Sequence, residues 1–141
     1  RPRFLFMAYT SQTDIEAVLP PKFLTDALDD DANGTADTGV LTAVLGVVDN
    51  EIDALITPTV EIPLSSPYPA RIKHAALVLA CDVLYRRRGI PDEGNPWAER
   101  ATAMRTDLEK VGRGELALDA ASALVAGFTE HTLDFDPEAE T

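Results

Sequence analysis

Apolar residues recur at intervals of three and four along much of this chain, the spacing that puts side chains on one face of an α-helix. The clearest run predicts a helix over 38–56. Its apolar stripe consists of Leu41, Val44, Leu45, Val48, Ile52, Leu55 and Ile56. Asp49, Asn50 and Asp53 fall off that stripe, so we expect them on a solvated helix face.

The segment 68–88 differs, because it is apolar around nearly its whole circumference. One stripe consists of Ile72, Ala76, Leu79 and Val83. The rest is covered largely by Leu77, Val78, Cys81 and Leu84. Such a helix lies in the centre of a fold or in a subunit interface, and the pattern leaves both open. The cations Arg86, Arg87 and Arg88 suit the negative end of the helix dipole, and Gly89 would end the helix.

Weaker signals near the start of the chain predict two short helices. Ser11 and Asp14 resemble a capping box that opens a helix over 12–19, and the prolines at 20–21 would end it. The stretch "KFLTDAL" that follows is long enough for two helical turns before an acidic loop.

A last helix is predicted over 96–111. Asn95 is a suitable N-cap, and Pro96 suits the first helical position. The expected buried face consists of Trp97, Ala101, Met104, Leu108 and Val111. Gly112 and Gly114 would stop this helix.

These segments predict an all-α fold, a small bundle of about four to five helices. The proline-rich stretch "TPTVEIPLSSPYP" forms a long connector, with a short extended piece expected around 60–64. Residues 1–6 precede Met7 and are treated as a leader. The helical domain is expected over 7–118, followed by an extended C-terminal tail, 119–141.

Composition narrows the range of functions. The chain has 141 residues, is 45% hydrophobic and carries 24 acidic against 12 basic side chains, a net charge of −12. A chain of this size can form a hydrophobic core. Its negative charge disfavours non-specific binding to a nucleic-acid backbone. The lone Cys81 cannot form an internal disulfide. The longest apolar run, "AALVLAC", is far shorter than a membrane span.

The acidic stretch "DDDANGTAD" at 29–37 resembles a calcium-binding loop. Positions 1, 3, 5, 6 and 9 of that pattern are filled by Asp29, Asp31, Asn33, Gly34 and Asp37. The bidentate glutamate of position 12 is replaced by Val40. The remaining groups could hold an ion weakly, and they make up the candidate metal site. The alternative is a tight turn between helices, with Asp37 or Thr38 capping the next helix.

No pattern of catalytic residues stands out. His74 and His131 have no Cys or second His within helical reach, and Cys81 has no catalytic-looking partner. Asp49 and Asp53, one helical turn apart, could act as an acid and a base, but a solvated face explains them as well. We expect no enzyme activity and no cofactor.

Five stretches in order resemble the Mu-like phage and prophage head–tail connector family. These are "MAYTSQTDIEAVLP", the acidic turn "DDDANG", "DNEID", "ACDVLY" and "GELALD". The resemblance covers about residues 7–119, and the tail after Asp119 departs from it. It implies an adaptor that forms a ring, with a dodecamer as the expected assembly, between a portal protein and a head-closure or tail-completion protein. It also implies a place in the virion neck after assembly in the bacterial cytoplasm.

In such a ring, DNA would pass through the lumen without specific binding, and an acidic wall would suit that passage. The expected partner interface includes Arg86, Arg87 and Arg88. In the tail it includes Phe128, Leu133 and Phe135, large apolar side chains within an acidic segment. Two other classes stay open: a monomeric calcium-responsive helical module that uses the 29–37 loop, and a small helical enzyme that uses Asp49 and Asp53.

Overall fold

The computed structural model describes residues 8–62, 64 and 67–118, and within them it shows helices and no strand. The order is α1 (Gln12–Glu16), α2 (Pro21–Leu28), α3 (Val40–Ile56), α4 (Ala70–Arg87), the short 3₁₀ helix η2 (Asp92–Gly94) and α5 (Ala98–Gly112). The predicted all-α fold is therefore confirmed. The extended piece expected around 60–64 does not appear as a strand among the described residues of the connector.

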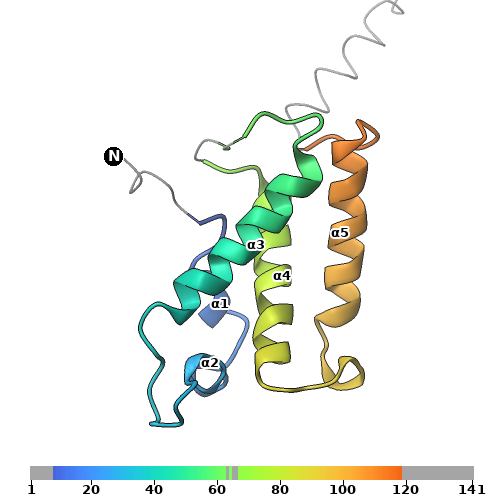
Figure 1. Cartoon of the computed structure of the whole chain (residues 1–141). Helices are drawn as coiled ribbons and strands as arrows, with labels where there is room; N and C mark the ends of the chain where they lie inside the picture. The colour runs from blue at the N-terminus through green and yellow to red at the C-terminus, as the bar shows by residue number, and fades with distance from the viewer. Residues whose placement is uncertain (1–7, 63, 65–66, 119–141) are drawn as a thin grey trace, which may run out of the picture.

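Helix α4 is the centre of the fold (Figure 1). The helices α3 and α5 flank it, and α1 and α2 pack against it near the bottom of the view. Ile72, Leu79, Cys81 and Leu84 of α4 are completely buried. Of the two explanations for its apolar circumference, the central position is correct, since neighbours within one copy already cover most of it.

The ends of the helices follow the sequence signals only in part. The Ser11 hydroxyl accepts a hydrogen bond from the backbone N–H of Asp14 at 3.1 Å, as a capping residue does. Helix α4 ends as predicted, because Gly89 has a φ of +77° and its N–H donates to the carbonyl of Arg86 at 2.9 Å. Helix α1 ends at Glu16, three residues earlier than expected.

The predicted N-caps of α3 and α5 are wrong in detail. Gly39, with a φ of +86°, precedes α3, and no side chain caps that helix. Neither Asp37 nor Thr38 serves as its cap. Before α5, the Asn95 side chain accepts a hydrogen bond from the N–H of Trp97 at 2.9 Å, so it caps the turn that leads into the helix.

The far ends of α3 and α5 approach each other closely. A Cβ placed on Gly112 would lie 2.1 Å from the carbonyl oxygen of Leu55, and the Thr59 hydroxyl donates to the carbonyl of Val111 at 2.6 Å. A glycine at this point lets the two backbones meet. The described chain ends at Leu118, six residues after the end of α5.

Candidate functional site

The acidic loop between α2 and α3 folds around its own carboxylates. Asp29 accepts hydrogen bonds from the N–H groups of Asn33 at 3.1 Å and Gly34 at 2.7 Å. Asp31 also accepts from the N–H of Asn33, at 3.2 Å. Asp37 closes the loop, since its carboxylate accepts from the N–H of Asp30 at 2.7 Å.

This folding brings together three of the four predicted metal-site residues. Oxygen atoms of Asp29, Asp31 and Asp37 lie within 4.8 Å of one another. The Asn33 side chain instead donates to Asp31 at 3.3 Å and accepts from the N–H of Thr35 at 2.9 Å, so it serves the turn. Val40 begins α3, so position 12 of the loop offers no carboxylate. The side-chain ligands that the loop could offer a divalent cation are these three carboxylates.

Two of these carboxylates titrate as a pair. Desolvation raises the pKa of Asp29, but hydrogen bonds from the N–H groups of Gly34 and Asn33 outweigh it and lower the pKa overall. The hydrogen bond to Asp29, desolvation and the charge of Asp37 raise the pKa of Asp31. The hydrogen bonds of the loop therefore favour the charged form of Asp29 over that of Asp31.

The three arginines predicted for a partner interface all make contacts within the chain. Arg86 pairs with Asp82 at 3.0 Å and with Asp92 at 3.1 Å. Arg87 donates to the carbonyl of Ala27 at 2.9 Å and forms an ion pair with Asp30. The Arg88 guanidinium lies 4.8 Å from the ring centre of Phe23, a cation–π distance. Their role toward a partner stays a prediction.

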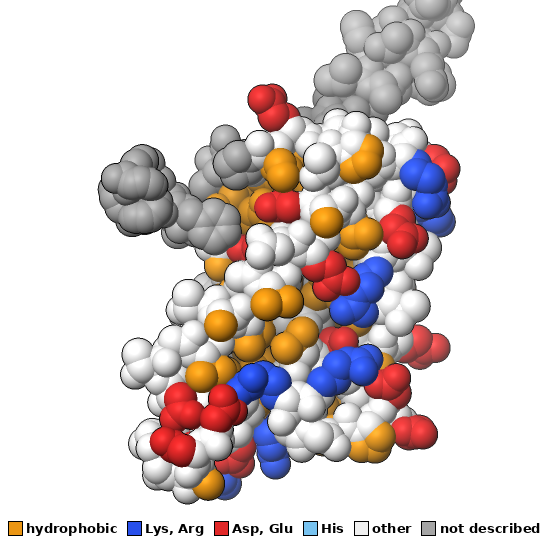
Figure 2. All heavy atoms as spheres, in the orientation of Figure 1, with side chains coloured by type: hydrophobic (Ala, Val, Ile, Leu, Met, Phe, Trp, Pro, Cys, Tyr) orange, Lys and Arg blue, Asp and Glu red, His pale blue; other side chains and the backbone are white. Residues whose placement is uncertain are grey.

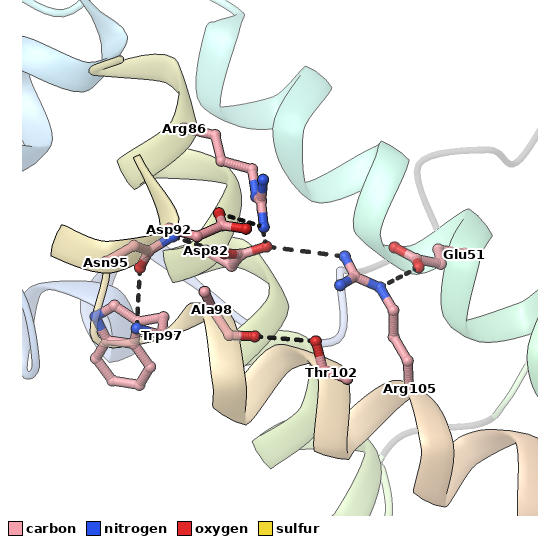
Figure 3. A network of polar contacts seen from close by, with 9 residues as sticks. All are labelled: Glu51, Asp82, Arg86, Asp92, Asn95, Trp97, Ala98, Thr102 and Arg105. Carbon is pink, nitrogen blue, oxygen red and sulfur yellow. Dashed lines mark hydrogen bonds and ion pairs between the residues drawn. The ribbon is translucent and has the colours of Figure 1, made fainter. Parts of the chain in front are cut away.

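A buried carboxylate that the sequence did not single out organises a polar network between α3, α4 and α5 (Figure 3). Asp82 of α4 is fully buried and accepts from the Asn95 side chain at 2.7 Å. Arg86 and Arg105 approach the same carboxylate, at 3.0 and 3.9 Å. Arg105 also pairs with Glu51 of α3 at 2.6 Å. The network ties the three long helices together.

A second buried carboxylate corrects the expectation for α3. Asp49 was predicted on a solvated face, but only 1% of it is exposed, because the segment before α1 covers it. Both carboxylate oxygens of Asp49 lie 3.3 Å from the N–H of Tyr9, and the Tyr9 hydroxyl donates to Asp53 at 2.6 Å. These aspartates fix the N-terminal segment, and the geometry does not present them to a substrate.

An apolar groove lies along the edge of α3, where its exposed side chains border its buried face. It has a volume of about 510 Å³ and is lined by Val40, Ala43, Val44 and Val47 of α3 and by Val83 of α4, with Asp30, Thr38, Gly39 and Arg87 at its rim. We call it the valine groove. Figure 2 shows hydrophobic side chains gathered over α3, with acidic and basic ones beside them. Val47 is 62% exposed, the largest value among the exposed large hydrophobic residues of the described chain.

The predicted tail anchors Phe128, Leu133 and Phe135 lie outside the described residues. In the described part of the chain, no helix is both long enough and apolar enough to span a membrane.

Comparison with known proteins gives one match. The family described as Bacteriophage Mu, Gp36 matches residues 9–130, which include all the described helices and Phe128 but neither Leu133 nor Phe135. No curated protein and no solved structure gives a significant match. Since the match covers most of the sequence, the chain belongs to the bacteriophage Mu Gp36 family.

Proposed function

We propose that this protein is a head–tail connector of a tailed phage or prophage. Membership of a bacteriophage Mu family over residues 9–130 carries the proposal. The compact helical unit fits a structural subunit, since the buried Asp49 and Asp82 and the partly buried Asp53 all bind groups of the chain itself. In this role the protein joins a portal protein to a head-closure or tail-completion protein in the virion neck.

The subunit would act as one member of a ring. Twelve copies of 15.2 kDa would weigh about 182 kDa. The exposed arginines at the end of α4 and the C-terminal tail are the surfaces we propose for contacts between subunits or with the portal. With a net charge of −12, a lumen formed by this chain would repel DNA phosphates and let the genome pass.

Mass in solution tests the ring. Light scattering behind a sizing column, run at several protein concentrations and with purified portal protein, should give one discrete oligomer that grows at the expense of the monomer. A monomer under all of these conditions would contradict the proposal. A gel-shift assay at physiological salt should show no DNA binding, because counterion release requires a basic surface.

A second candidate function is supported by the convergence of Asp29, Asp31 and Asp37 within 4.8 Å. In this alternative the chain is a monomeric module that responds to calcium through its acidic loop. Comparing the mass and the circular dichroism spectrum in calcium and in a chelator separates the two proposals. A change with calcium in a protein that stays monomeric would favour the module.

A further inference from the structure

We propose that the valine groove receives the C-terminal segment 128–135 of a neighbouring copy. The inference rests on the proposed ring, since it requires a second copy beside each subunit. Leu133 and Phe135 would be the apolar anchors, with Phe128 as a third.

The groove has the character of a docking site for a narrow segment. Val40, Ala43, Val44 and Val47 recur at the spacing of one helix face, which starts at the buried Val44 and extends to the exposed Ala43 and Val47. With Val83 they form an apolar trough open to solvent. A few small side chains are too little area for a stable dimer contact on their own, whereas a peptide with alternate anchors can use such a trough.

The chain itself supplies a segment of the matching kind. The 23 residues after Leu118 include three large apolar side chains between Phe128 and Phe135 but no Lys or Arg. A segment of this composition buries little surface by itself, so it gains most by packing on a preformed apolar surface.

The described chain ends on the C-terminal side of α3, at a distance from the segment's own groove. Leu118 follows α5, whose end meets α3 at Leu55, near the C-terminus of α3. The valine groove lies along the N-terminal half of α3. Because α3 has 17 residues, its length of about 25 Å separates the exit from the far end of the groove. The segment therefore starts away from its own groove.

The positive charge of Arg87 at the rim of the groove would orient the docked segment. Arg87 uses its Nε for the carbonyl of Ala27 and one terminal nitrogen for Asp30, out of five N–H donors in a guanidinium. Its remaining donors can bind Asp134 or Asp136 when Leu133 and Phe135 lie on the valines. Asp30 competes for the same cation and repels those acids, so Asp30→Asn should strengthen docking.

Disulfide trapping between two chains tests the inference on the full-length protein. The native Cys81 is buried and stays out of the reaction. A chain with Ala43→Cys is mixed with a mass-tagged chain with Thr132→Cys, which keeps both anchors. We expect a mixed disulfide dimer as the main oxidised product. A chain with Val18→Cys, at another exposed valine, should give only background.

The dependence on apolar contact provides the second measurement. Two changes should each lower the yield of mixed disulfide roughly tenfold or more, the effect of losing a buried anchor. One adds Val47→Asp to the chain that carries Ala43→Cys. The other truncates the tagged chain after Gly127 and places its Cys at the new end. Val18→Asp should leave the yield unchanged. Val47 is largely exposed, so its substitution does not disturb the core.

Two results of the mixing experiment would overturn the inference: no disulfide above the Val18→Cys background, or a yield insensitive to Val47→Asp. A third comes from one chain that carries both Ala43→Cys and Thr132→Cys, if its disulfide forms only within that chain. The mass of the unmodified protein in solution separates a failure of this docking inference from a failure of the proposed connector function. A discrete ring without trapping leaves the connector proposal standing, and a monomer without trapping removes both.

Discussion

The backbone N–H of Tyr9 lies 3.3 Å from each carboxylate oxygen of Asp49, forty residues away in the sequence. This contact closes the N-terminal segment over α3, and the Tyr9 ring then packs edge-on against Tyr68 at a centroid distance of 4.8 Å. Burial of the carboxylate makes it costly to charge, which leads to a prediction about pH.

Stability should fall as the pH rises from about 4 to above 6. Desolvation raises the pKa of Asp49 from 3.8 to about 6. The hydrogen bond from the Tyr9 N–H opposes this rise, and the charge of Asp53 adds to it. The folded state therefore holds this proton more tightly than the unfolded state. The protonated Asp49 therefore contributes up to about 3 kcal/mol to the free energy of unfolding. This contribution is present below the pKa of the unfolded state and is lost as the pH rises through the pKa of the folded state.

Asp49→Asn should remove that contribution, because the amide keeps an acceptor for the Tyr9 N–H without a charge. We expect the variant to be more stable than the parent by about 1–3 kcal/mol at pH 7 and to match it more closely near pH 4. Urea denaturation at several pH values measures this, with Glu93→Gln, at an exposed position, as the control. Equal loss of stability at both pH values would show that packing and not ionisation governs Asp49.

The junction between α3 and α5 predicts opposite effects for two glycines. Gly112→Ala places a Cβ 2.1 Å from the Leu55 carbonyl and must push the helices apart, at a cost of about 1–3 kcal/mol. Gly46→Ala, inside α3, meets no atom within 4 Å and should stabilise the fold by about 0.5–1 kcal/mol. Thermal melts of the two variants check this pair. A Gly112→Ala protein as stable as the parent would mean that the helices do not meet this closely.

The polar network gives a contrast between a buried and an exposed acid. Asp82→Ala leaves the side chains of Asn95 and Arg86 without their buried acceptor and should cost about 3–5 kcal/mol. Glu51→Gln weakens one partly exposed pair with Arg105 and should cost no more than about 1 kcal/mol. Chemical denaturation curves give both values. Similar losses for the two variants would contradict the central role of Asp82.

Local patterns predicted the helices well because each uses a stripe that the sequence itself displays. The apolar stripe of α3 contains Val48, Ile52 and Ile56, and all three are buried. The acidic loop was also foreseeable, since the hydrogen bonds that Asp29 accepts from Asn33 and Gly34 are local, from residues four and five positions ahead.

The two buried carboxylates were missed for a shared reason. Apart from Arg86, which is four residues after Asp82, their partners come from distant segments. Tyr9 reaches Asp49 across forty residues, and Asn95 and Arg105 reach Asp82 from beyond the end of α4. Helical periodicity sorts residues by polarity, so it assigns an aspartate to solvent wherever no donor is visible nearby. Only the packing of the tertiary fold supplies these donors.

The last prediction concerns calcium and the loop at 29–37. Three carboxylates converge there, but Val40 replaces the glutamate that would supply two ligand oxygens and hold α3 on the ion. We therefore expect low-millimolar calcium to change neither the melting temperature nor the oligomeric state by much. A ligand at a hundred times its dissociation constant would add about 2.7 kcal/mol to the free energy of unfolding, which a thermal melt detects easily. Magnesium at the same concentration controls for ionic strength. A shift of several degrees with calcium alone, abolished by Asp29→Ala, would establish the loop as a true calcium site.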